Sequence, residues 1–581
     1  MRNEKQLPAL SLPEDWGQRR RDALKWNEQI DDTGRVASVL TALAGHQAEG
    51  TVTRGQTSQR VSLLDFDTDN SRLTLDVGAS ILSAPFEIAL QGAGAVYRFN
   101  VKRGKQNGSQ FVAEVPGALT QSRQRWNRRC TPAGTVRLSF RHPKTGTIVR
   151  GTIHDVSHTG LAVDCDLPTD LSPGSKLAGL RVERPGQEAV ALNCEVRYTR
   201  TEDVEDHERL GLRIAHPMLD YLRWSNVVED LLYPGTKCSP EYAGKVWDLF
   251  GQCGYFLLAG RTMESFKRLE KAYHSVNRIL ENAPQLYKQI VWTNPSDDQV
   301  IGTATSLKIY SGTWLGYHMA KLPGRSPDGT DGREILRELN FRGFEHIQRD
   351  PELEWGHCTV RQDANWTRYA YYDFAERMHS DEVFMVPFTA MELYSEKPVL
   401  AATGQFETLE ATPEEEEQLA THLEETRPLS YRACMDLERH SLKMERNKRL
   451  WKGHRLERDR AIFVARKDGV AQAAAVIEMA ADGVHVFQLL NLVRLYPLVE
   501  GGEAAYADLL EEVRNWFDEY EKERFVVYVE DGTVLEEELA DQCINLGKAD
   551  MLFCAADRIP ELLENIYQIA APKLLSAPAK K

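Results

Sequence analysis

The chain lacks the features of several protein classes. No stretch reaches the roughly 18 consecutive apolar residues of a membrane-spanning helix, and Met1–Arg21 contains no continuous apolar run of the secretory kind. The nine cysteines form no CxxC pair, and no histidine pair stands beside one at metal-binding spacing. We therefore expect a cytoplasmic protein with reduced thiols, no membrane span and no metal site.

Basic residues are also in deficit. The chain has 71 Lys and Arg against 86 Asp and Glu, a net charge of -15. A DNA or RNA partner is not expected, because phosphate backbones require a basic surface. One segment departs from this balance, since Gln121–Arg150 contains eight Lys or Arg and no acidic residue. This local excess predicts an anion-binding site in an otherwise acidic protein.

The length and residue patterns predict a multidomain protein. Short alternating apolar runs separated by Gly, Asn and Asp indicate two small antiparallel β-barrels, and mixed helix and strand patterns follow them. The predicted domains are a helical leader at 1–35, a β-barrel domain at 36–119, a second barrel with its linker at 120–234, and α/β domains at 235–405 and 406–575. The leader is expected to contain a helix over Trp16–Ile30.

The two α/β segments repeat the same order of elements, which we interpret as a distant tandem duplication. Between them, Thr412, Pro413 and the glutamates that follow predict a helix start, because Thr caps, Pro fits the first helical position and acidic side chains favour the helix N-terminus.

A two-part motif lies at the start of the second predicted barrel. Arg125 and Arg129 form an RxxxR pattern with Arg128 between them, and 25 residues separate Arg129 from the next part. The second part consists of Asp155, Ser157 and Gly160. Arginine binds phosphate or guanine edges with a planar fork, a carboxylate accepts from guanine N–H groups, and glycine lets the backbone approach a ligand. Taken separately, each part also fits a solvated basic linker and an ordinary Asx-type turn.

The motif resembles that of the PilZ family, RxxxR followed by D/N-x-S-x-x-G at this separation. The resemblance implies that cyclic di-GMP is the ligand and that nothing in the domain is catalytic. It assigns Arg125 and Arg129 to the linker half of the site, and Asp155, Ser157 and Gly160 to the barrel half. Arg128 is an additional candidate, and Gly211 lies where family members often carry a further glycine. His154 and His158, which flank the second part, are expected to be surface residues.

The order of a small β domain, an RxxxR linker and a PilZ-like barrel over residues 36–232 is similar to the flagellar-brake group. That resemblance implies that the ligand orders the linker and reorients the two domains.

Residues 455–560 resemble the GNAT N-acetyltransferase fold by element order. The family's acyl-CoA loop, R/Q-x-x-G-x-G/A before a helix, corresponds here to Gly501, Gly502 and Ala504. Val499 replaces the expected Arg or Gln, and Glu500 and Glu503 place negative charge where a pyrophosphate would lie. A non-catalytic GNAT-like module is therefore expected. A second such fold is predicted at 285–395, where the neighbours His357 and Cys358 are expected to be structural.

The sequence as a whole predicts a cyclic di-GMP receptor that acts on a protein partner through its GNAT-like half. One alternative is a cyclic di-GMP-regulated N-acyltransferase that uses acetyl-CoA at the loop described above. Another is a structural adaptor with a vestigial nucleotide site, which the complete set of motif residues disfavours.

Overall fold

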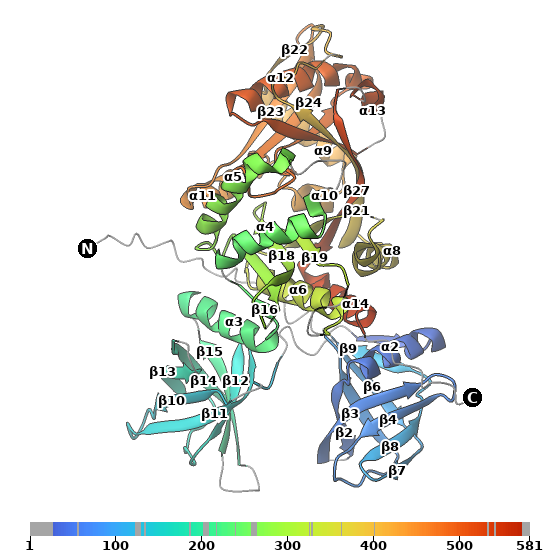
Figure 1. The fold of residues 1–581 in the computed structure, drawn as a ribbon, viewed down its shortest axis with the longest axis vertical. Helices are drawn as coiled ribbons and strands as arrows, with labels where there is room; N and C mark the ends of the chain where they lie inside the picture. The colour runs from blue at the N-terminus through green and yellow to red at the C-terminus, as the bar shows by residue number, and fades with distance from the viewer. Residues whose placement is uncertain are drawn as a thin grey trace. The chain divides into compact units, whose positions relative to one another are not determined.

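The structure is a computed structural model (Figure 1), and it describes residues 27–54, 57–93, 95–122, 129–132, 135–184, 188–201, 208–215, 218–238, 240–256, 264–294, 296–324, 326, 329–361, 363–399, 401–530, 534–539 and 542–571. The chain divides into two compact units, which meet in sequence between Lys237 and Cys238. In the described part of the chain, no helix is long and apolar enough to cross a membrane.

The first domain of unit 1 is an antiparallel sheet with one helix. The sheet order is β1 (Asn27–Ile30), β9 (Leu119–Ser122), β6 (Val96–Val101), β5 (Phe86–Gln91), β2 (Glu49–Arg54), β3 (Thr57–Asp67), β4 (Arg72–Asp76), β8 (Gln110–Glu114) and β7 (Gly104–Asn107). Helix α2 (Thr33–Gly45) packs on β3. Its N-cap Asp32 accepts a hydrogen bond of 2.7 Å from Arg35 N.

Four sequence-based expectations change in this domain. Asn27–Ile30 is a strand paired with Leu119–Ser122, so the predicted helix over Trp16–Ile30 is wrong at its end, and its earlier residues lie outside the described ones. The partner strand lies where a linker was expected. Helix α2 begins the region that was expected to contain only strands. In place of a closed barrel, the described strands form a sheet whose order has two ends.

The second domain of unit 1 is a closed barrel followed by a helix. The barrel order is β10 (Arg137–Arg141), β11 (Ile148–Ser157), β12 (Gly160–Cys165), β15 (Glu208–Ala215), β14 (Val190–Thr201) and β13 (Lys176–Glu183). Alternate residues such as Leu161, Val163 and Cys165 point into its core. Helix α3 (Met218–Leu232) contributes the fully buried Trp224 to the same core. The closed form removes exposed strand edges.

Unit 2 contains one long, mostly antiparallel sheet. From β17 the order is β17 (Tyr287–Thr293), β18 (Val300–Lys308), β19 (Thr313–Lys321), β20 (Trp355–Val360), β27 (Ile544–Ala555), β21 (Val383–Tyr394), β26 (Arg524–Val529), β25 (Leu492–Pro497), β24 (Val470–Ala480), β23 (Arg458–Lys467) and β22 (Glu407–Glu410). Two neighbouring pairs are parallel, β19 with β20 and β25 with β26. β27, from near the end of the chain, lies between β20 and β21, and Figure 1 shows it beside β21.

Helices cover both faces of this sheet. We call residues 238–405 the first part of unit 2 and residues 406–571 its second part. The helices of the first part are α4 (Ala243–Gln252), α5 (Glu264–Leu280), α6 (Gly332–Ile347), α7 (Asn365–Thr367) and α8 (Asp373–Met378). Helix α6 packs on Ile290 and Trp292, whereas α4 packs on Val291 between them. Because successive strand residues face opposite sides, α4 and α6 lie on opposite faces of the sheet.

The remaining helices of unit 2 belong to its second part. They are α9 (Pro413–Thr426), α10 (Leu429–Cys434), α11 (Glu445–Gly453), α12 (Tyr506–Glu519), α13 (Val534–Leu539) and α14 (Ile559–Ile569). The predicted helix start is confirmed, since Thr412 caps α9 in a reciprocal capping box with Glu415 and Pro413 is the first helical residue.

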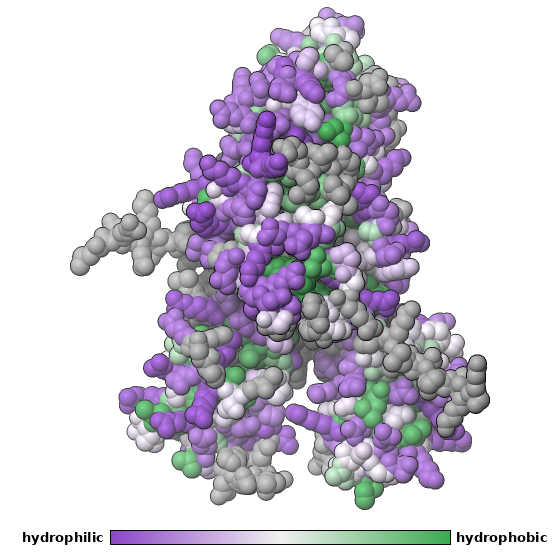
Figure 2. All heavy atoms as spheres, viewed as in Figure 1, coloured by the Kyte–Doolittle hydropathy of each residue, from purple (hydrophilic) through white to green (hydrophobic). Residues whose placement is uncertain are grey.

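In the space-filling view the face shown is mostly hydrophilic, with scattered apolar patches (Figure 2).

Candidate ligand-binding site

The two parts of the sequence motif meet at the edge of strand β11. Cys130 forms an isolated antiparallel bridge with Val156, and the two backbone hydrogen bonds of this bridge are 3.0 and 2.9 Å long. The bridge places the preceding residue, Arg129, beside Asp155 on the barrel surface. Arg125 and Arg128 lie outside the described residues.

Arg129 and Asp155 form an ion pair. The Nη1 atom of Arg129 lies 3.3 Å from both carboxylate oxygens of Asp155. The two side chains are 37% and 21% exposed, so the pair is accessible from solvent. Exposed ion pairs stabilise a fold by no more than about 1 kcal/mol. The pair is therefore able to open for an anion that offers Arg129 a better partner and leaves Asp155 as a hydrogen-bond acceptor.

The turn from β11 to β12 holds the other motif residues. The hydroxyl of the buried Ser157 donates to the carbonyl oxygen of Gly160 at 3.2 Å, and Trp224 Nε1 donates to the Ser157 carbonyl at 3.1 Å. A Cβ atom on Gly160 would lie 2.6 Å from the carbonyl oxygen of Leu212, so only glycine fits there. In this structure Ser157 and Gly160 shape the turn that carries Asp155. His158 is 1% exposed, so its expected surface position is wrong.

A row of residues in register extends from Asp155 across the barrel. Asp155 is opposite Ala162, Ala162 is opposite Gly211, and Gly211 is opposite Tyr198. A Cβ on Gly211 would lie 2.0 Å from the Tyr198 ring, so the ring lies directly over the glycine. Ala162, which is 1% exposed, and Gly211 are buried, and these two small residues form a strip, the shelf, between the partly exposed Asp155 and a ring that is 39% exposed. The exposed part of the Tyr198 ring can serve as a stacking partner for a planar base.

Ion pairs border this shelf. Arg209 Nε lies 2.6 Å from Asp164 Oδ1. Arg213 and Arg197 both pair with Glu195, at 2.9 and 3.0 Å. The hydrogen bond from Arg197 holds the pKa of Glu195 below its usual value, and the charge of Arg213 acts in the same direction. The shelf therefore has guanidinium groups on its rim that can bind phosphate oxygens in place of their present carboxylate partners.

Sequence reasoning did not identify Tyr198, Arg209 or Arg213. Their positions depend on the strand register, which includes bulges between Ile153 and Asp155 and between Val196 and Tyr198. The one available signal was Gly211, because a glycine within a strand often marks the close approach of another group.

The candidate acyl-CoA loop in unit 2 has a different geometry. Gly501 has a φ of 75°, Gly502 N donates to the Val499 carbonyl at 3.0 Å, and Ala504 N donates to the Gly501 carbonyl at 3.3 Å. A Cβ on Gly502 would lie 2.2 Å from the Gln472 carbonyl oxygen. These amides already bond within the turn, and the glycine is packed against strand β24.

His357 and Cys358 both line a cavity in unit 2, although they are neighbours on one strand. Burial lowers the pKa of His357 to about 4 and raises the pKa of Cys358 to about 12. Near neutral pH the imidazole and the thiol are both uncharged, which does not suit a base and nucleophile pair.

Comparison with known proteins identifies the barrel. Residues 123–223 match the family model of the PilZ domain. No match was found among curated proteins. The structure of the K. pneumonia MrkH-c-di-GMP complex is 17% identical, covers 36% of this chain and 97% of its own, and has a TM-score of 0.31. YcgR from Escherichia coli in complex with c-di-GMP is 16% identical, with coverages of 38% and 96% and a TM-score of 0.28.

A third solved structure matches more of the chain. It is a tandem GNAT protein from the clavulanic acid biosynthesis pathway, 14% identical, which covers 55% of this chain and 98% of its own at a TM-score of 0.31.

Proposed function

We propose that this chain, which carries a PilZ domain at residues 123–223, is a receptor for cyclic di-GMP. The observation that carries the proposal is the ion pair between Arg129 and Asp155, which joins the two parts of the motif on the barrel surface. Cyclic di-GMP offers two phosphates for guanidinium groups and two guanine edges for an acceptor such as Asp155. The Tyr198 ring, which lies over Gly211 at the shelf, gives a guanine ring a stacking surface.

The ligand is proposed to act by ordering the segment that joins the first domain to the barrel. The proposed nucleotide-binding residues are Arg125 and Arg128 in that segment and Arg129, Asp155, Ser157 and Gly160 at the barrel. An anion that binds the linker arginines and the barrel surface at once favours one arrangement of the two domains, because it binds that arrangement more tightly than the others. Unit 2 is the proposed output module, acting on a protein partner.

The tandem interpretation of unit 2 is supported by its strand order. Each part contains three strands, then a helix, then a fourth strand that is parallel to the third. In the first part these are β17, β18 and β19, helix α6 and strand β20. In the second part they are β23, β24 and β25, helix α12 and strand β26. Strands β21 and β27 pair with each other at the centre. We propose two GNAT-like modules that exchange their last strands. The alternative of an acyl-CoA-dependent enzyme receives no support from the Gly501–Ala504 turn.

Calorimetric titration of the full chain with cyclic di-GMP tests the receptor function. We expect saturable binding that weakens as salt rises, because the site is built from arginines. Cyclic di-AMP serves as the control, since adenine has no N1–H donor for Asp155 and should bind at least about tenfold more weakly. An absence of binding at high micromolar nucleotide would refute the proposal.

Tyr198 provides a test of the shelf. Replacing Tyr198 with alanine removes a stacking surface that is worth about 1–3 kcal/mol per base, so the Kd for cyclic di-GMP should rise at least about fivefold. The same titration measures it. The control is Ile148→Ala, which removes an exposed apolar side chain from a different strand, β11. This variant should leave the Kd unchanged. Equal Kd values for wild type and Tyr198→Ala would show that the base lies elsewhere.

A further inference from the structure

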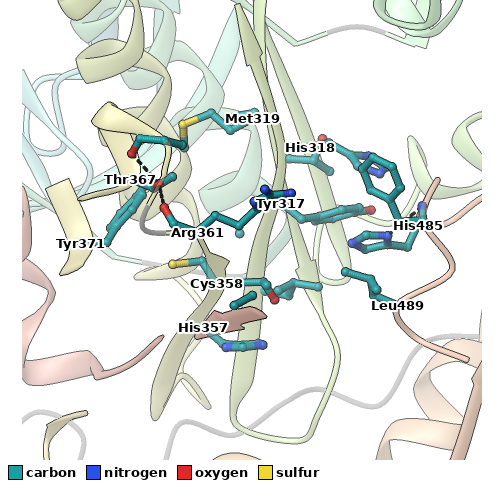
Figure 3. Close-up of a pocket in the computed structure, with 18 of the residues that line it drawn as sticks. Tyr317, His318, Met319, His357, Cys358, Arg361, Thr367, Tyr371, His485 and Leu489 are labelled. Carbon is teal, nitrogen blue, oxygen red and sulfur yellow. Dashed lines mark hydrogen bonds between the residues drawn. The ribbon is translucent and has the colours of Figure 1, made fainter. Parts of the chain in front are cut away.

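Unit 2 contains a cavity of about 520 Å³ between strands β19 and β20 (Figure 3). The volume lies within the range of about 300–1,000 Å³ typical of small-molecule sites. The parallel register of these strands runs from Thr313 opposite Trp355 to Gly316 opposite Cys358. The cavity is lined by the residues that come next on each strand, Tyr317, His318 and Met319 on β19 and Thr359 on β20. The space thus begins where the two strands separate.

The second part of unit 2 completes this cavity. His485, Phe487 and Leu489, in the segment between β24 and β25, line it together with β19 (Figure 3). Hydrogen bonds fix the segment, since the Tyr317 hydroxyl donates to the Val484 carbonyl at 2.8 Å and Val486 N donates to His318 Nε2 at 3.1 Å. The cavity is therefore shared between the two parts of unit 2.

The interior suits an apolar ligand. Most of the lining is aromatic or aliphatic, including Trp314, Leu315, Leu339, Phe344 and Phe388. Burial holds the pKa of His318 well below its ordinary value and lowers that of His357 to about 4, so these two imidazoles are uncharged near neutral pH. Such a space favours an aliphatic chain and disfavours a charged group.

The buried His318 is held in place by the segment between β24 and β25. His318 is 1% exposed, and its Nε2 accepts a hydrogen bond, so the neutral ring carries its proton on Nδ1. Within the described residues, Nδ1 has no hydrogen-bond partner.

Basic side chains stand at the exposed part of the cavity. Arg361 follows strand β20, and Lys548 lies on β27, two residues before the Asp550 that pairs with Val360. Arg361 is paired with Asp363 at 2.6 Å, whereas Lys548 is exposed. The charged lining residues Arg361, Asp363 and Lys548 therefore sum to one positive charge, which favours a ligand with one anionic end.

The helix that follows β19 does not offer a free N-terminus to a nucleotide diphosphate. Helix α6 is capped by Asp331, whose carboxylate accepts from Arg333 N at 2.8 Å. That carboxylate occupies the helix N-terminus, where a diphosphate would otherwise bind, and it would repel the phosphate charges.

We propose that this cavity binds an aliphatic carboxylate, with its chain among the apolar walls and its carboxylate beside Lys548 and Arg361. The proposal does not depend on cyclic di-GMP binding. The ligand is bound without a covalent bond. The segment between β24 and β25, which contains His485, Phe487 and Leu489, forms the wall beside its aliphatic chain.

Titration of the full chain with dodecanoate tests the proposal. We expect saturable binding that Lys548→Met weakens at least tenfold, whereas Lys271→Met, an exposed lysine on α5, leaves it unchanged. Gly316→Phe should abolish binding by filling the cavity, because a Cβ at this lining position meets only the His357 carbonyl oxygen, at 3.8 Å. The thermal unfolding of each variant is recorded beside its binding curve.

Three outcomes would overturn the proposal. One is the absence of dodecanoate binding to the wild-type chain. Another is equal affinity in wild type and in folded Lys548→Met. The third is binding of dodecanoyl-CoA at least tenfold tighter than dodecanoate, which would show that a nucleotide is accommodated after all. None of these outcomes changes the titration with cyclic di-GMP.

Discussion

Replacing Asp155 with alanine will weaken cyclic di-GMP binding by about 10- to 100-fold or more. In the proposed complex, Asp155 accepts hydrogen bonds from the N–H groups of one guanine, and hydrogen bonds to a charged partner are worth about 1.5–3 kcal/mol. Alanine leaves those donors without an acceptor, and it also frees Arg129 from its present position 3.3 Å from the carboxylate. Arg129→Ala should have an effect of similar size, because it removes a phosphate ligand.

The variants are compared by calorimetry with a matched acidic control. Asp166→Ala removes an exposed carboxylate just beyond the end of β12 in the same barrel and should leave the Kd unchanged. The barrel should remain folded in every variant, since the ion pair of Arg129 and Asp155 is solvent-accessible and contributes no more than about 1 kcal/mol to stability. Wild-type affinity in Asp155→Ala would exclude this surface as the site.

Local sequence signals predicted parts of the molecule that depend on local interactions. Two such features are formed by residues within a few positions of one another. One is the start of helix α9 at Thr412 and Pro413, and the other is the turn that joins Ser157 to Gly160. The residue types alone specify such contacts, because a capping side chain or a turn serine finds its partner within one turn of the chain. The approach of Arg129 to Asp155 was accessible only through the resemblance to a family motif.

Long-range pairings were not predictable in the same way. Strand β27 lies between β20 and β21, and the short strand β1 pairs with β9 about 90 residues later. An alternating pattern identifies a strand and its buried face, but it contains no information about the neighbouring strand. The cavity in unit 2 has the same origin, because its walls come from segments that are separated by up to about 290 residues.

A buried charge cluster that no sequence signal marked stabilises the second part of unit 2. The side chain of Glu478 on β24 is fully buried between Arg458 at 2.5 Å, Arg460 at 2.7 Å and Arg494 at 3.3 Å. The Tyr310 hydroxyl, from the first part of unit 2, donates to the same carboxylate at 3.0 Å. Glu478 is thus a shared partner for three guanidinium groups, and it connects the two parts of unit 2.

Replacing Glu478 with glutamine will destabilise unit 2 by about 3–5 kcal/mol, because it leaves buried guanidinium charges without their counter-charge. Scanning calorimetry should show a lowered transition for unit 2 and an unchanged transition for the PilZ domain. Glu457→Gln removes a similar contact, 2.6 Å from Lys522, but its carboxylate is 43% exposed, so the loss should stay below about 1 kcal/mol. Equal transition temperatures for the two variants would contradict the predicted role of Glu478.

The pH dependence of unfolding provides a second test of the cluster. Burial alone would raise the pKa of Glu478, but the three arginines outweigh it and hold the pKa at about 2, below the ordinary 4.5. A carboxyl whose pKa is lower in the folded state stabilises the fold fully above pH 4.5 and loses that contribution as the pH falls towards 2. Wild type should therefore lose stability steeply across this interval. In Glu478→Gln the slope of unfolding free energy against pH should be shallower, because the titrating group is absent, and an identical slope in the two proteins would show that the carboxylate does not couple to folding.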